Sequence, residues 1–248
     1  MASTVPMPVQ SFGRPPRALN VVRDPRPEEL GAAIDWSSWY LTDEEDMGEG
    51  IEQSEIIDVL RSAMRALAVE RQWTRVFVGS DQFFAWLPEE PLVRVSPDVY
   101  LLDDPPAPPM PASWQTWRQG HRPPRLAVEI VSGDEPHPER WRKDYEQGPE
   151  KYAQLGTQEL VIFDPQAALG RAREAQRVAL QVYRRAADGV FVRVYVGPGP
   201  CASHELSAFL VPVTEGGVAR LRVARDPEGR DWVPTAAEAR DAAERARD

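Results

Sequence analysis

The chain has 248 residues, 42% of them hydrophobic, which is enough for the core of one large domain or of one domain with appendages. Its net charge of −10 disfavours tight binding of nucleic acid without cations, because phosphate contacts need clustered Lys and Arg. The single Cys201 excludes an intramolecular disulfide framework. With no run of 18 apolar residues and no signal-peptide pattern, we expect a soluble cytoplasmic protein.

The first predicted element is a helix over residues 51–69. The preceding segment 1–34 is rich in Pro and Arg, a composition that predicts no regular structure. In the helix, apolar residues recur with helical spacing and form one stripe. Acidic residues lie in or just before its first turn, where negative charge compensates the helix dipole: Glu49, Glu52 and Glu55.

Three strands are predicted next, over residues 75–79, 82–87 and 92–102, joined by short turns as a meander. Asp98 falls on the third of these strands. Residues 105–125 then form a long proline-rich segment with Trp114, Trp117 and His121. Loops of this length are often binding loops or lids. The alternative is that this segment does not contact a substrate.

Two carboxylates occur in runs of β-forming residues. Asp98 follows Pro97 within 93–102, and Glu129 lies inside the apolar strand 126–131. Asp after Pro often opens a turn and Glu in a strand often faces solvent, but a buried carboxylate needs a compensating cation. Because Mg²⁺ is commonly held by one or two carboxylates together with water and phosphate oxygens, the pair predicts a shared metal site.

A second helix is predicted over residues 138–155, with Trp141, Tyr145, Tyr152 and Leu155 on its apolar side. Proline removes a backbone donor and disfavours helix in the residue before it, so we expect a break at Gly148-Pro149 and a restart at Pro149. The only two lysines of the chain, Lys143 and Lys151, belong to this region. They are either site residues or ordinary surface charge.

The last third of the chain predicts mainly strands, over residues 159–163, 179–184 and 190–196 and in a hairpin around Gly216-Gly217. From Thr235 the chain reads as an Ala-rich charged helix. We therefore expect three parts: an N-terminal segment 1–34, a domain 35–234 and a C-terminal helix 235–248.

Several fragments, in this order and spacing, resemble the Uma-two family of restriction-endonuclease-like proteins within the PD-(D/E)-X-K nucleases. The fragments are Pro97-Asp98, Val128-Glu129-Ile130-Val131-Ser132, Tyr152 to Gly156, and Glu159 to Pro165. The resemblance runs from about residue 51 to residue 232. It implies an α/β, restriction-endonuclease-like core, in which a central mixed β-sheet is flanked by helices, with extra C-terminal strands here.

The resemblance also implies a function and a site. It implies phosphodiester hydrolysis with Mg²⁺ or Mn²⁺, the metal held by Asp98, Glu129 and the carbonyl of Ile130. The first helix of this nuclease class often adds a carboxylate, for which Glu52 is the candidate and Glu55 and Glu49 are alternatives. The expected partners are a nucleic acid, DNA rather than RNA, and a second copy of the chain in a homodimer.

One position departs from the family pattern. The family carries a lysine four residues before the tyrosine matched by Tyr152, and Gly148 stands there. The lysine function then falls to Lys151 or Lys143. The alternative is a catalytically inactive nuclease-like fold that serves as a binding or assembly module.

Overall fold

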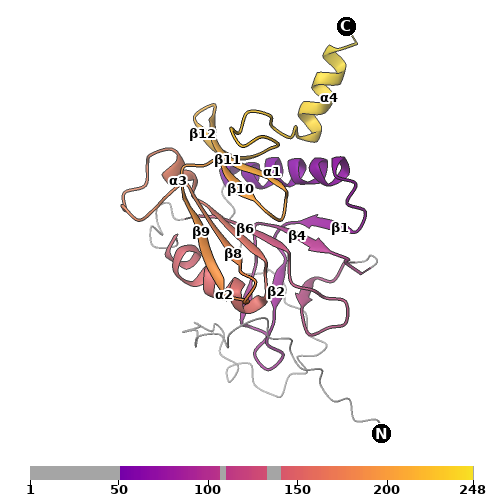
Figure 1. Cartoon of the computed structure of the whole chain (residues 1–248), viewed down its shortest axis with the longest axis vertical. Helices are drawn as coiled ribbons and strands as arrows, with labels where there is room; N and C mark the ends of the chain where they lie inside the picture. Colours follow the sequence, from indigo (N-terminus) through magenta and orange to yellow (C-terminus); the bar gives the residue numbers. More distant parts are fainter. Residues whose placement is uncertain (1–50, 107–109, 133–140, 248) are drawn as a thin grey trace.

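A computed structural model describes residues 51–106, 110–132 and 141–247, so the segment 1–34 and Glu49 lie outside the described residues. The centre of the fold is a six-stranded sheet in the order β1-β4-β6-β7-β8-β9 (Figure 1). Its strands are β1 Val76–Gly79, β4 Val99–Asp103, β6 Leu126–Ile130, β7 Glu159–Phe163, β8 Leu180–Arg185 and β9 Phe191–Gly197. Only β6 and β7 pair in parallel, so the sheet is mixed, which confirms the predicted α/β core.

Two three-stranded sheets accompany the central one. The first has the order β3-β2-β5, with β2 Phe83–Ala85, β3 Arg94–Val95 and β5 Ser113–Gln115. The second has the order β10-β11-β12, with β10 Cys201–Ser203, β11 Ala208–Glu215 and β12 Val218–Ala224. The second sheet includes the predicted hairpin at Gly216-Gly217, which confirms the extra C-terminal strands.

The helical segments are α1 Ile51–Glu70, the π-helical turn η2 Lys143–Gln147, α2 Gly148–Leu155, α3 Pro165–Ala168 and α4 Ala236–Arg245. Helices α1 and α4 confirm the predicted helices at the two ends of the described chain. Helix α4 begins with a capping box, in which Thr235 and Glu238 satisfy each other's backbone N–H groups. Among the described residues, no helix combines the length and apolarity needed to cross a membrane.

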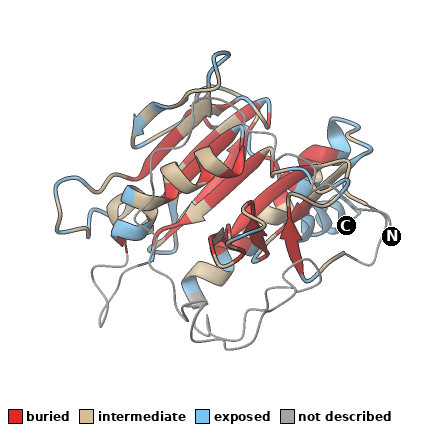
Figure 2. Ribbon diagram, turned by 90° about the horizontal axis from the view of Figure 1, so that it is seen from below, coloured by how far each residue is buried: buried red, intermediate tan, exposed pale blue. Residues whose placement is uncertain are grey.

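The middle strands of the central sheet, β4, β6 and β7, are buried on both faces (Figure 2). Successive strand residues alternate between the faces, so Val99 and Leu101 pack with α1 and the β10–β12 sheet, while Tyr100 and Leu102 pack with the other core. That second core includes Tyr152 of α2 and residues of β2, β3 and β5. The sheet therefore lies between two layers, and α2 covers one face only.

The predicted meander is wrong in one respect. Strand β1 pairs with β4, whereas β2 and β3 pair with each other in a separate sheet. The predicted strand 92–102 is two strands, because Pro97 cannot continue the ladder as a donor. Asp98 therefore precedes β4 and is not a strand residue.

The segment 105–125 is not a free loop along its whole length. Its residues 113–115 form β5, which pairs in parallel with β2. Trp114 is fully buried, donates its indole N–H to the carbonyl of Arg122 at 2.7 Å, and stacks on His121. This part of the segment is core structure, so a lid that contacts substrate is not its role.

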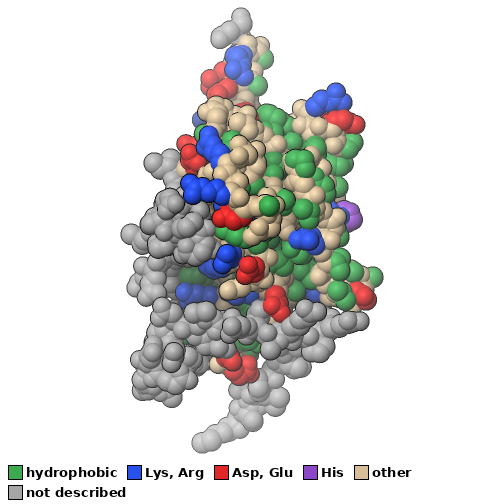
Figure 3. Space-filling view, turned by 90° about the vertical axis from the view of Figure 1, so that its left-hand side faces the viewer, with side chains coloured by type: hydrophobic (Ala, Val, Ile, Leu, Met, Phe, Trp, Pro, Cys, Tyr) green, Lys and Arg blue, Asp and Glu red, His purple; other side chains and the backbone are tan. Residues whose placement is uncertain are grey.

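Strand β9 forms one edge of the central sheet. Val192, Val194 and Val196 are all more than one-third exposed there. Figure 3 shows one face of the molecule on which hydrophobic side chains gather over part of the surface. The pairing of β9 with β8 shifts by one residue between Val182 and Tyr183. A bulge of this kind twists an edge strand and disfavours pairing with another chain.

Candidate active site

Asp98 and Glu129 meet at one end of the central sheet. Strands β4 and β6 are antiparallel with Val99 opposite Val128, so Asp98 just before β4 and Glu129 near the end of β6 lie at the same end of the two strands. The charge of Asp98 acts on Glu129, which shows that the two carboxyl groups are close. The fold therefore brings together the two carboxylates that the sequence singled out.

Asp98 is buried, with 8% of its surface exposed, and both of its oxygens accept hydrogen bonds. Oδ1 accepts from Nε2 of Gln53 at 2.9 Å, and Oδ2 accepts from the backbone N–H of Ile130 at 2.5 Å. The first bond comes from the first turn of α1 and the second from the end of β6. Asp98 is thus held in position by two elements far apart in the sequence.

Glu129 faces α2, where the hydroxyl of Tyr152 donates to its Oε1 at 2.5 Å. Burial, and then the negative charges of Asp98 and Asp144, raise the pKa of Glu129 well above its ordinary value. The hydrogen bond from Tyr152 and the charge of Lys143 act in the opposite direction. Without a cation, the ionised form of Glu129 is therefore disfavoured at this position.

Both lysines of the chain lie within electrostatic range of these carboxylates. Burial and the charge of Lys143 lower the pKa of Lys151, while Glu129 and Asp144 raise it. Lys151 is partly buried, whereas Lys143 is exposed. Of the two, Lys151 is the one whose ammonium group has lost more of its hydration.

The geometry of this helix differs from the prediction, because there is no break at Gly148-Pro149. Residues 143–147 form the π-helical turn, and the N–H of Gly148 donates to the carbonyl of Lys143. A π turn has i→i+5 hydrogen bonds and so roughly 4.4 residues per turn, and such turns are frequent at functional sites. Proline is then tolerated in the first turn of α2, because its missing N–H would have no partner there.

The π turn also aligns the two lysines. In a regular α-helix, two residues eight positions apart differ by about 80° around the helix axis. Here five of the eight steps are π-helical, so Lys143 and Lys151 differ by only roughly 10°. The expectation that Lys143 lies beyond a helix break is therefore wrong. Both lysines project from the same side of the continuous helix.

The structure places Glu52 away from this cluster. Glu52 is exposed, whereas its neighbour Gln53 contacts Asp98. Glu55 forms a salt bridge with Arg220 of β12. Across residues 51–106, 110–132 and 141–247, no three or more His, Cys, Asp and Glu side chains are grouped for metal binding, so α1 does not complete a three-carboxylate site.

Sequence reasoning missed two polar residues of the site, Gln53 and Asp144. Gln53 stands three and four residues before the buried Ile56 and Ile57, so its phase on the helix indicated an inward position. Asp144 is partly buried, and burial is the first cause that raises its pKa to about 7. Asp144 belongs to the π turn, and no sequence pattern indicated that turn.

A buried network fixes the π turn against the sheet. The hydroxyl of Tyr145 donates to Asp164 at 3.0 Å, and the guanidinium of Arg177 binds both oxygens of the same carboxylate at 2.7 and 2.9 Å. Asp164 is fully buried and also caps α3. Because Tyr145 belongs to η2, this network sets the position of the neighbouring Asp144.

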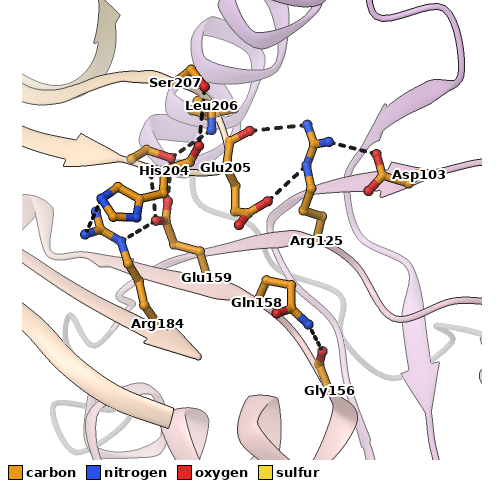
Figure 4. Close-up of polar contacts among 11 residues, drawn as sticks. Asp103, Arg125, Gly156, Gln158, Glu159, Arg184, His204, Glu205, Leu206 and Ser207 are labelled. Atoms are coloured by element: carbon orange, nitrogen blue, oxygen red, sulfur yellow. Dashed lines mark hydrogen bonds and ion pairs between the residues drawn. The ribbon is translucent and has the colours of Figure 1, made fainter. Parts of the chain in front are cut away.

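A second polar cluster lies at the opposite end of β6 and β7 (Figure 4). Glu159, the first residue of β7, accepts from Arg184 at 2.7 Å, from the N–H of His204 at 3.0 Å and from the hydroxyl of Ser203. These bonds tie β10 to the central sheet. With its charge paired and its oxygens hydrogen-bonded, Glu159 has a structural role.

One family of known proteins matches most of the chain. The model of the Uma2 family, described as "Putative restriction endonuclease", matches residues 44–205, which is more than half of the chain. The match spans Asp98, Glu129, both lysines and Tyr152. No curated protein matches the chain. The chain therefore belongs to the Uma2 family, the Uma-two family that its sequence fragments resemble.

Proposed function

We propose that the protein hydrolyses phosphodiester bonds of DNA with the help of Mg²⁺ or Mn²⁺. The observation that carries the proposal is the proximity of Asp98 and Glu129, whose charges interact where β4 begins and β6 ends, with both lysines of the chain within electrostatic range of Glu129. In the reaction, water adds to phosphorus and the bond from phosphorus to one sugar oxygen breaks. The products are a phosphomonoester end and a sugar hydroxyl.

The chemistry of the paired residues fits a divalent cation. Each carboxylate oxygen has more than one lone-pair site, so the hydrogen bonds from Gln53, Ile130 and Tyr152 leave acceptor capacity on both side chains. Repulsion from Asp98 contributes to the raised pKa of Glu129, and a bound cation would relieve it. Asp98, Glu129 and the carbonyl of Ile130 would hold the ion, which would stabilise negative charge and lower the pKa of bound water.

The protein residues would then orient and stabilise the reacting groups. Gln53 and the N–H of Ile130 fix the direction of Asp98, and Tyr152 fixes that of Glu129. Lys151, partly buried, would face the negative charge that develops on the phosphoryl oxygens, a role that gains strength where water is excluded. Lys143 would add a second, more hydrated positive charge.

Gly148 supports the alternative of an inactive binding module. Among the described residues, a Cβ at Gly148 would have only the carbonyl oxygen of Lys143, at 3.8 Å, as a neighbour within 4 Å beyond the adjacent helical backbone. A Cβ therefore fits at the position where the family has its lysine. If the wild type cleaves neither DNA nor RNA while Gly148→Lys gains cleavage, the inactive module is the correct function.

Calorimetry and plasmid nicking test the proposal together. We expect the wild type to bind Mn²⁺ and to nick plasmid DNA with Mg²⁺ or Mn²⁺, and Asp98→Ala to lose both properties. Unchanged metal binding in Asp98→Ala would contradict the proposed site. The expected homodimer stays a prediction, which light scattering on the purified protein tests.

A further inference from the structure

A groove between α1 and α4 lies outside the residues of the proposed active site. It has a volume of about 610 Å³, within the range of about 300–1,000 Å³ common for ligand sites. Three arginines line it, Arg61 and Arg65 from α1 and Arg240 from α4, against one acidic residue, Asp58. The lining is therefore positively charged, although the whole chain carries a net charge of −10.

The same helix carries the groove and the contact to Asp98. Gln53, which contacts Asp98, precedes Arg61 by eight residues, or about 12 Å along α1, and Arg65 is about one further turn away. Arg61 donates to the hydroxyl of Ser80 at 2.7 Å, and the next residue, Asp81, donates its N–H to the carbonyl of Pro97 at 3.1 Å. The arginines therefore lie several nucleotide lengths from the proposed metal site, along the same helix.

The spacing and exposure of the arginines suit a repeated anion. Arg61 and Arg65 are four residues, or about 6 Å, apart along α1, which is close to the roughly 6.8 Å that two nucleotides of a duplex strand advance along the helix axis. Arg65 and Arg240 are exposed, and Arg61 is partly exposed. The hydroxyl of Ser62 accepts from the N–H of Ala236 at 2.9 Å, which fixes α4 to α1 beside the groove.

We propose that this groove binds the sugar-phosphate backbone of the nucleic acid, several nucleotides from the bond that is cleaved. The inference rests on the proposed function and adds the path that the substrate takes. Phosphate contacts by arginine are independent of base sequence, so the groove would give affinity and register without sequence specificity. It also offers a reason why an acidic chain can bind a polyanion, since the charge that matters is local.

The test is the binding of a fluorescent 30-base-pair DNA duplex in EDTA, followed by anisotropy over a range of salt concentrations. The groove variant carries Arg61→Gln, Arg65→Gln and Arg240→Gln. The matched control carries the same change at three arginines outside the groove, Arg75, Arg171 and Arg173. The slope of log K against log salt is negative, and each phosphate contact makes it steeper by about one. We expect the groove variant to make this slope shallower by about 3, one for each lost phosphate contact, and the control to keep the wild-type slope.

Arg61 and Arg65 also hold Ser80 and the carbonyl of Val78, so the melting temperature of each variant is measured alongside. Arg240→Gln alone, at an exposed position of α4, should make the slope shallower by about 1 without a change in melting temperature. The inference is overturned by a groove variant that binds like the wild type, or by a wild type that binds no DNA. It is also overturned if decaglutamate peptide binds the arginines more tightly than DNA, because the groove would then be a protein-docking surface.

Binding in EDTA is separate from cleavage, so the two proposals can fail independently. If DNA binding depends on the groove and no metal gives cleavage, the nuclease function fails and the groove remains. If the wild type cleaves DNA and the groove variant binds DNA as well as the wild type does, only the groove inference fails.

Discussion

Replacing Asp144 with Asn should stabilise the metal-free protein at alkaline pH. In the folded chain, burial is the main factor that raises the pKa of this carboxyl, from an ordinary value of 3.8 to about 7. The nearby charge of Asp164 also raises it, while Lys143 and Lys151 oppose the shift. Asn resembles the protonated acid in size and polarity but cannot ionise.

The sign of the effect follows from proton linkage. Well below pH 3.8, Asp144 is protonated in the folded and the unfolded chain, so the variant and the wild type should differ little. Between pH 4 and 7 the folded chain binds a proton that the unfolded chain has lost, so the free energy of unfolding of the wild type falls as the pH rises. A shift of roughly three units corresponds to a ceiling of about 4 kcal/mol above pH 7.

Urea denaturation in EDTA at pH 4, 6 and 8 measures this difference. We expect Asp144→Asn to gain between about 1 and 4 kcal/mol over the wild type at pH 8, and the gain to shrink toward zero at pH 4. Glu146→Gln, at an exposed position of the same turn, is the matched control and should change stability by less than about 0.5 kcal/mol. A variant that is no more stable than the wild type at pH 8 would refute a destabilising charge at Asp144.

Three further predictions separate structural from catalytic roles. Glu129→Gln should leave the melting temperature in EDTA at pH 8 unchanged or higher, because the ionised carboxylate is disfavoured there, and a clear fall would identify a structural partner. Lys151→Ala should abolish metal-dependent plasmid nicking while Lys143→Ala keeps most of it, since only Lys151 is partly buried; the reverse order would exchange their roles. Gln53→Ala should weaken Mn²⁺ binding in calorimetry by about tenfold through the loss of its bond to Asp98, whereas Glu52→Ala should not.

Local patterns predicted elements whose cause is local. The apolar period of α1, the β-forming run around Glu129 and the charged Ala-rich string after Thr235 each correspond to an element in the structure. Patterns failed where pairing decides the outcome. The strands near Asp98 are short and interrupted by Pro97, and nothing local indicates that β1 pairs with β4 while β2 pairs with β5.

The candidate site shows the same division. Asp98 and Glu129 stand out in the sequence, because a carboxylate within a β-forming, apolar run is costly unless it is compensated. Gln53 could have been chosen over Glu52 from its phase on the helix alone. The role of Asp144 and the alignment of the two lysines could not have been predicted from the sequence. They depend on a π turn that is held by Tyr145, Asp164 and Arg177.

The residue types available for chemistry, and most of the elements that carry them, can be identified from the amino-acid sequence. Composition, periodicity and the positions of proline and glycine act over a few residues, so they can be evaluated before the chain folds. Which of those residues meet depends on the folded chain. Asp98 and Glu129 meet because β4 and β6 pair, and the groove of Arg61, Arg65 and Arg240 comes from the packing of α4 on α1. Both depend on contacts between residues far apart in the chain.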